Sequence, residues 1–148
     1  MAYCTEADVQ TAVGGAIKLA QLSDQDNLLS GAVNHTVVTA AITEACAEMD
    51  SYIGHRYAVP LSPVPDIVKL KATAWAARVL RRDAYNGQPL ADDLTREETD
   101  RTWLEGVGKG TISLGIEPTP VKASIVTDKA APRDSTLSIS RLKLRGYA

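Results

Sequence analysis

The side chains in this chain of 148 residues that are spaced most like metal ligands lie between Asp24 and Asn27. Alternating acidic side chains can surround a hard cation such as Ca²⁺. However, Leu29 stands where a calcium loop needs glycine, and His35 stands where it needs a closing bidentate glutamate. We therefore interpret residues 23–34 as a polar loop that leads into a capped helix, with metal binding as the alternative.

Histidine and cysteine, the other usual ligands and nucleophiles, are few and scattered. His35 and His55 lie at the two ends of one predicted helix, which would separate them by roughly 30 Å. Cys4 and Cys46 belong to different predicted helices and form no C-x-x-C motif. We expect a reduced pair of buried thiols, as in a cytoplasmic protein, rather than a disulfide framework.

Motifs for nucleophilic or phosphate chemistry are also missing. The sequence has no G-x-S-x-G motif, and Lys109-Gly110-Thr111 has the wrong order for a phosphate-binding loop. The paired acids at 92–93 and 97–98 are typical of a solvated helix start. The sequence therefore predicts no enzyme, no catalytic residue, no cofactor and no metal.

Apolar periodicity predicts the elements that organise the chain. Thr5 and Asp8 form a variant of the capping box at the start of the first helix, and Asn34 can cap the third. We expect helices over about 5–13, 16–22 (with Ile17 and Leu22 turned inward), 35–54, 64–85 and 92–107, the last capped by Asp92 or Asp93 and ended by Gly106, Gly108 and Gly110.

The two central helices are predicted to pack as an antiparallel pair. The inward stripe of helix 35–54 consists of Val38, Ile42, Ala45, Met49 and Ile53. In helix 64–85 the predicted stripe consists of Ile67, Leu70, Ala74 and Ala77, widened by Val68, Trp75 and Val79, with Lys71, Arg78 and Arg82 on the opposite side.

A proline-rich elbow joins these two helices. Gly54 can end the first helix in the left-handed conformation of a C-cap. Pro60, Pro63 and Pro65 are then expected to hold the chain extended, and Pro65 suits the first turn of the next helix.

After Gly115 the helical periodicity ends and strand-like patterns begin. Residues 123–127 and 136–140 have the pattern of short strands, but two such pieces are too small to form a stable sheet alone. We predict a mainly α fold: a bundle of four to five helices over 1–110, followed by an extended C-terminal arm over 111–148 that carries short β-strands. The arm is expected to dock on a partner; the alternatives are that it folds back on its own helices or is simply disordered.

Charge is distributed unevenly although the net charge is only −2. Residues 1–60 carry −5, residues 61–110 carry 0 and residues 111–148 carry +3. The low net charge argues against a dedicated nucleic-acid binder. An acidic start and a basic end would suit copies that touch head to tail, unless the charge simply fluctuates along the chain.

No signal peptide is visible, and no apolar run reaches the ~18 residues that span a bilayer. We expect a soluble protein made in a cytoplasm, without membrane contact.

Three stretches carry a resemblance. The elbow reads Asp50-Ser51-Tyr52-Ile53 and then Arg56-Tyr57 and Pro60-Leu61; the start reads Met1-Ala2-Tyr3-Cys4-Thr5; the end is the basic segment 138–147. In combination they resemble a small family of virion proteins from Mu-like phages and prophages, commonly described only as a domain of unknown function. The resemblance implies a head–tail connector subunit. It would form a ring of twelve around the DNA channel, close to the packaged DNA, between the portal and the tail or neck proteins of the virion.

Within that expectation the arm grips the portal or an adjacent subunit. Its contact residues would be Arg133, Leu137, Ile139, Arg141, Leu142, Lys143, Leu144, Arg145 and Tyr147. The elbow residues would be Tyr52, Arg56, Tyr57 and Pro60. They either reach a neighbouring subunit or, as we favour for Arg56 and Tyr57, hold the elbow within the chain. Two rival functions remain: a tail-completion or other neck subunit, and a DNA-binding regulator that uses Lys69, Lys71, Arg78, Arg81 and Arg82.

Overall fold

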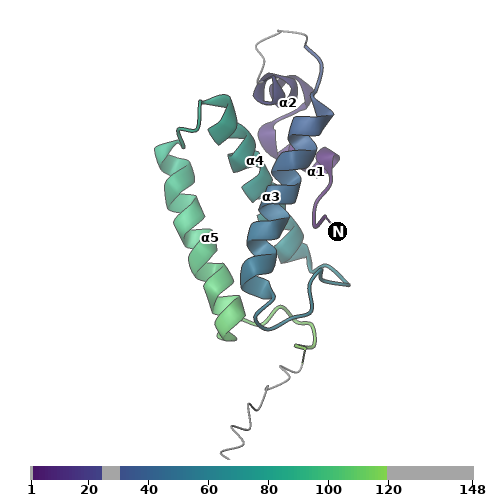
Figure 1. Ribbon diagram of the computed structural model, residues 1–148, viewed down its shortest axis with the longest axis vertical. Coiled ribbons are helices and arrows are strands. Elements are labelled where there is room, and N and C mark those ends of the chain that lie inside the picture. The colour runs from purple at the N-terminus through teal and green to yellow at the C-terminus, as the bar shows by residue number, and fades with distance from the viewer. Residues whose placement is uncertain (1, 25–30, 120–148) are drawn as a thin grey trace, which may run out of the picture.

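Five helices make up the part of the chain that the computed structural model describes, residues 2–24 and 31–119 (Figure 1). They are α1 (Glu6–Val13), α2 (Ala16–Ser23), α3 (His35–Ile53), α4 (Asp66–Ala84) and α5 (Ala91–Lys109). These two ranges contain no strand, so the prediction of a mainly α fold with five helices is confirmed for them. The predicted strands at 123–127 and 136–140 lie outside the described residues.

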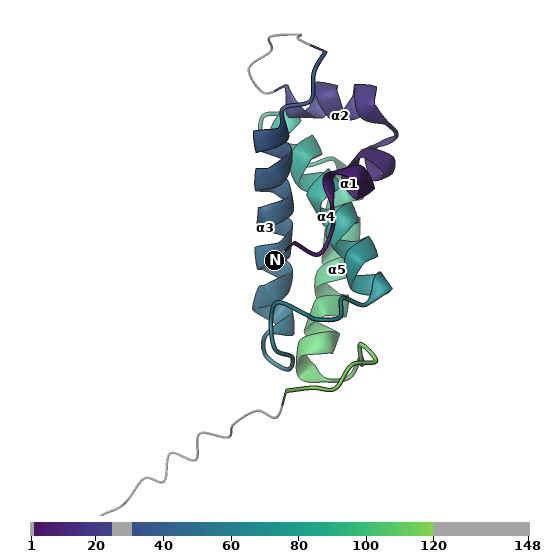
Figure 2. The same ribbon diagram turned by 90° about the vertical axis from the view of Figure 1, so that its right-hand side faces the viewer.

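Helices α3 and α4 form the antiparallel centre of the bundle, and their mutual contact is the most extensive in the fold. Helices α1 and α2 cover one side of this pair, and α5 runs along the other side (Figures 1 and 2). The predicted inward stripe of α3 is confirmed, because all five of its residues are buried: Val38, Ile42, Ala45, Met49 and Ile53. None of the described helices is both long enough and apolar enough to cross a lipid bilayer.

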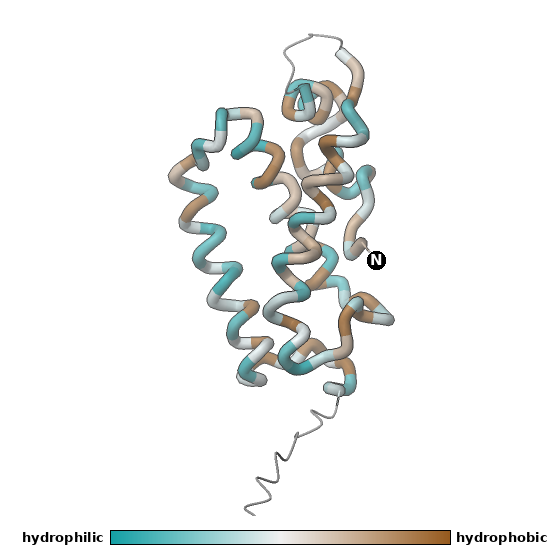
Figure 3. The backbone as a smooth tube through the Cα atoms, viewed as in Figure 1, coloured by the Kyte–Doolittle hydropathy of each residue, from teal (hydrophilic) through white to brown (hydrophobic). Residues whose placement is uncertain are grey.

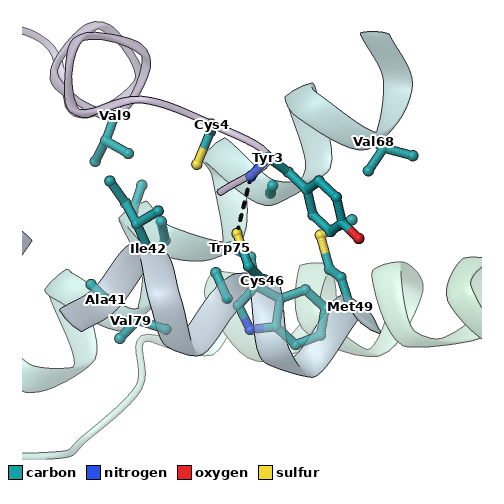
Figure 4. Packing of buried hydrophobic residues seen from close by; sticks show 14 of the residues in the cluster. Tyr3, Cys4, Val9, Ala41, Ile42, Cys46, Met49, Val68, Trp75 and Val79 are labelled. Carbon is teal, nitrogen blue, oxygen red and sulfur yellow. Dashed lines mark hydrogen bonds between the residues drawn. The ribbon is translucent and has the colours of Figure 1, made fainter. Parts of the chain in front are cut away.

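Two helix starts follow the predicted capping chemistry. The Thr5 hydroxyl accepts a hydrogen bond from the Asp8 N–H, and the Asp8 carboxylate accepts one from the Thr5 N–H. The Asn34 side chain accepts hydrogen bonds from the first N–H groups of α3. Cys4, however, precedes α1 rather than lying in it. It is buried beside α3, which carries the second buried free cysteine, Cys46 (Figure 4).

The predicted inward stripe of α4 is partly confirmed. Ala77 is buried, as are Val68, Trp75 and Val79, which were predicted to widen the stripe. Ile67 and Leu70, however, are 40% and 65% exposed, and Ala72 and Ala76 are buried in their place. Arg78 is also buried, although we expected it on the opposite side. Helical spacing allowed more than one centre for this face, and the partners that α4 meets in the fold decided it.

The prediction for α2 needs a similar correction. Ile17 is 78% exposed, and the helix turns Leu19, Ala20 and Ser23 inward instead, with Leu22 half-buried against the core. In a helix of 8 residues, a few apolar side chains fit more than one face.

Helix α5 is longer than predicted and begins differently. It starts after Leu90, which makes no side-chain capping bond, and Asp93 is buried rather than solvated because it pairs with Arg81 of α4. Gly106 and Gly108 lie inside the helix instead of ending it. A Cβ at Gly108 would lie 2.8 Å from the carbonyl oxygen of Tyr52. Glycine at this position therefore lets α5 approach the end of α3 closely.

The observed register of α4 predicts a contrast between two leucines of the same helix. Leu80 is fully buried and Leu70 is 65% exposed. Leu80→Ala should lower the free energy of unfolding by about 2–5 kcal/mol, whereas Leu70→Ala should change it by less than about 0.5 kcal/mol. Denaturant unfolding followed by circular dichroism measures both. A larger loss at Leu70 would contradict the register.

The capping box predicts a pH effect at Asp8. Hydrogen bonds from the side chain and N–H of Thr5, together with Lys69, lower the pKa of Asp8 from 3.8 to about 2. Because this pKa is lowered in the folded state, the carboxylate contributes stability above about pH 4 and loses it as the pH falls through 2. Thr5→Ala should move the pKa of Asp8 back toward 3.8, as measured by NMR titration of the carboxyl carbon. The exposed Thr36→Ala is the control and should leave that pKa unchanged; an Asp8 that still titrates near 2 in Thr5→Ala would assign the effect to the N–H of residue 5 and to Lys69.

Candidate functional site

One end of the bundle gathers the sequence features that we connected with assembly. The elbow (residues 54–65), the last turns of α3 and α5, and the described start of the predicted arm (residues 111–119) all lie there in both ribbon views (Figures 1 and 2). We call this region the elbow end.

A buried tyrosine from the start of the chain holds the elbow to α3. The Tyr3 hydroxyl donates a hydrogen bond to Oδ1 of Asp50 and accepts one of 3.2 Å from the N–H of Leu61. Burial and the bond to Asp50 raise the pKa of Tyr3 above its ordinary value, so the phenol stays protonated and remains a donor. Residues from three separate segments therefore meet at one hydroxyl group. Figure 4 shows the ring of Tyr3 beside Met49 of α3.

A second tyrosine ties the start of the arm to the elbow. Tyr57 is buried, and its hydroxyl accepts a hydrogen bond of 3.2 Å from the N–H of Leu114. Leu114 is itself buried, and Ile112 and Ile116 pack against the core. The first residues after α5 thus fold back onto their own bundle, and the intrachain role that we favoured for Tyr57 agrees with this geometry.

Arg56 reaches the end of α5. A Cβ at residue 110 would overlap its guanidinium group, so Gly110, with φ +81°, leaves the space that Arg56 occupies. The guanidinium also lies 5.9 Å from the centre of the Tyr57 ring. Its Nε is buried and has no hydrogen-bond partner among the residues that the structure describes. Arg56 therefore occupies the space that Gly110 leaves at the end of α5.

The backbone of the elbow departs from the prediction in two ways. Gly54 has right-handed helical angles, φ −60° and ψ −16°, rather than the left-handed conformation. A Cβ there would lie 2.8 Å from the carbonyl oxygen of Asp50 and 3.4 Å from Val59, so close packing is what requires this glycine. The peptide bonds before Pro60 and Pro63 are cis, and the chain bends at both prolines instead of running extended.

Of the predicted elbow residues, Tyr52 is half-buried, with its carbonyl oxygen against Gly108, and Pro60 is exposed. Nothing in the fold shows which of them would meet a neighbouring subunit. The predicted contact residues of the arm, from Arg133 to Tyr147, lie outside the described residues. Sequence reasoning missed Tyr3, Asp50 and Leu114 as elbow partners, because no local pattern links residues that are 47 to 58 positions apart in the chain.

The basic residues of α4 do not form a free basic face. Each lies within salt-bridge distance of a carboxylate: Lys69 with Asp8, Lys71 and Arg78 with Asp100, Arg81 with Asp93, and Arg82 with Glu44. A helix that reads DNA needs such cations for phosphates and bases. The rival DNA-binding hypothesis thus loses the feature on which it was based.

His35 makes an ordinary polar contact, because its Nδ1 lies 2.9 Å from the carboxylate of Glu6. Within residues 2–24 and 31–119, no three histidine, cysteine or acidic side chains gather as metal ligands would. The middle of the calcium-like stretch, residues 25–30, lies outside the described residues.

The Tyr3 contact predicts a specific loss of stability. Tyr3→Phe keeps the buried ring but leaves the N–H of Leu61 without its acceptor and removes the donor to Asp50. An unsatisfied buried group costs about 1–3 kcal/mol, so the free energy of unfolding should fall by about that amount in urea titrations. Tyr85→Phe is the matched control, because Tyr85 is 53% exposed. Equal effects of the two substitutions would contradict the role of Tyr3.

Comparison with known proteins assigns this sequence to a family. The family model described as Bacteriophage Mu, Gp36 matches residues 3–129, which include Tyr3, the whole elbow and all five helices. The basic segment 138–147, which also carried the resemblance, lies beyond the matched residues.

A curated relative supports the same assignment. It is the Mu-like prophage FluMu protein gp36 of Haemophilus influenzae, which is 35% identical over 79 residues. The aligned stretch covers 53% of this chain and 53% of the relative, so the chain matches about half of the relative's length. Since the family match takes in most of the sequence and every described helix, the chain belongs to the Bacteriophage Mu Gp36 family.

Proposed function

We propose that this protein is a structural subunit of a phage virion, a head–tail connector that forms a ring between the portal and the tail or neck proteins. Membership of a bacteriophage family supports a phage role. The connector role and the ring of twelve come from the resemblance seen in the sequence. Such a ring arises from head-to-tail contacts that close by rotation.

The observation that carries the proposal is the construction of the elbow end. The last described residue, 119, lies at this end, and 29 residues follow it in the sequence, among them the basic residues of the predicted arm. Tyr57 and Leu114 fix the start of the arm to the elbow. A helical bundle with an arm that begins at one fixed end is suited to join one ring of subunits to another.

The charge pattern of α4 fits the same function. A subunit around a DNA channel must let DNA slide, and a row of free cations would hold the phosphates. In α4 the cations are paired with carboxylates of α1, α3, α4 and α5. The position at the neck, the portal as partner and synthesis in the host cytoplasm are parts of this proposal. A tail-completion or other neck subunit is the second candidate, in which the arm would meet tail proteins.

Removal of residues 133–148, the part of the arm that carries its predicted contact residues, tests the proposal. A chain that ends at residue 132 should keep the helical circular dichroism spectrum of the full chain, because every described helix precedes the cut. It should no longer bind purified portal rings in sedimentation assays.

A matched pair of full-length variants separates charge from length. Replacing Arg141, Lys143 and Arg145 with alanine should weaken portal binding at least about tenfold, since several charge-assisted contacts would be lost. Replacing Lys122 and Lys129 should change it little. Undiminished portal binding by the shortened chain would refute the role of the arm, and binding to tail proteins alone would favour the second candidate.

A further inference from the structure

The two halves of α5 are held to the bundle by different forces. In the C-terminal half, Leu104 and Val107 are 1% and 0% exposed and belong to the apolar core. In the N-terminal half, Ala91–Asp100, the two buried side chains are both carboxylates, Asp93 and Asp100, while Leu94 is 51% exposed. Figure 3 shows the difference as a largely hydrophilic upper α5 beside the mixed central helices.

Ion pairs with α4 replace apolar packing in this first half. Asp93 accepts two hydrogen bonds from Arg81, of 2.7 and 2.8 Å. Asp100 accepts one of 2.5 Å from Lys71 and one of 2.6 Å from Arg78. Toward α3 the nearest ion pair joins Arg101 to Glu48 at 3.5 Å.

The interface between this half of α5 and helices α3 and α4, which we call the seam, is incompletely filled. A cavity of about 80 Å³ lies among α3, α4 and α5, lined by Trp75, Arg78, Glu48, Glu97 and Arg101 among others. Arg78 is 7% exposed, and its Nε has no hydrogen-bond partner among the described residues. A polar cavity of this size has room for several waters. Water can therefore enter this seam at a lower cost than it could enter the apolar core.

The connection that leads into α5 is exposed at every residue from Ala84 to Asp92. Its backbone hydrogen bonds run to the end of α4 and within the turn itself, as in the bond of 2.9 Å from the N–H of Gly87 to the carbonyl oxygen of Arg82. Asn86 and Gly87 both have positive φ, as in a turn. A segment held mainly by polar contacts, between an exposed turn and a buried anchor, belongs to the low-stability part of a fold.

We propose that the first half of α5, Ala91–Asp100, is a hinged strap, which opens away from α4 while its second half and the rest of the bundle stay folded. Opening exposes four charged side chains to water: Asp93, Asp100, Arg78 and Arg81. Their hydration compensates for the ion pairs that they lose. It also uncovers Trp75 and Val79, which gives the subunit an apolar surface that the closed form hides. This strap is independent of the connector role.

Hydrogen exchange of the full-length chain, followed by mass spectrometry, tests the strap. Amides of residues 94–100 should exchange at least about tenfold faster than those of residues 104–109 and of the centre of α3. Raising NaCl to 1 M, where the Debye length is about 3 Å, should speed exchange in residues 94–100 and leave residues 104–109 unchanged. Equal protection of both halves in the wild-type chain would overturn the proposal.

A variant that closes the seam provides the converse test. The triple substitution Lys71→Met, Arg78→Met and Asp100→Leu replaces the whole ion group around Asp100 with apolar side chains, which is often neutral or stabilising. It should slow exchange of residues 94–100 to within about threefold of residues 104–109. Arg81→Met with Asp93→Leu is a second variant with the same expectation, should the first fail to fold.

The control uses an exposed ion pair in the second half of the helix. Glu105 and Lys109 pair at 2.8 Å with 51% and 70% exposed side chains. Substituting both with glutamine should not alter exchange in residues 94–100. If the seam-closing variants speed exchange there, or if salt speeds every helix equally, the strap does not exist as a separate unit.

Discussion

The contact between α3 and α4 is the one on which the rest of the structure depends. The chain has no phenylalanine, and alanines occupy several of the buried positions of this pair, among them Ala41, Ala45, Ala72 and Ala76. Small side chains let helices lie close together but bury little apolar area, and burial of apolar area is the main source of stability. The central pair therefore aligns the fold, and other elements must add to its stability.

Polar groups provide much of that addition. The Tyr3 hydroxyl joins Asp50 to Leu61, and the Tyr57 hydroxyl joins the elbow to Leu114. Each of these bonds links segments far apart in the sequence, and each is satisfied inside the protein, where an unpaired donor or acceptor would be costly. Such bonds specify one arrangement of the elbow more strictly than apolar contacts would, because they require direction as well as proximity.

Charge is used inside the bundle in the same way. The cations of α4 that looked like a surface for DNA hold α1, α3 and α5 in place. In the sequence, the excess of positive charge lies in residues 111–148, which carry +3. The pairing of the α4 cations also makes the first half of α5 the most polar attachment in the fold.

The sequence by itself determined the features that depend on neighbours a few residues away. The caps at Thr5 and Asn34 and the inward stripe of α3 were predicted correctly, because a cap needs only the next turn and α3 has one clear apolar face. In combination, the elbow, the start and the basic end of the chain also indicated the family that the comparison then showed.

Tertiary structure alone decided what depends on distant partners. The register of α4 was decided there, because Arg78 becomes a buried residue only when Asp100 stands opposite it. The continuation of α5 through Gly108 became intelligible only when Tyr52 of α3 was seen against it. The role of Tyr3 required a fold that brings Asp50 and Leu61 to its hydroxyl. Periodicity along one helix cannot contain this information, since it lies in which surfaces meet.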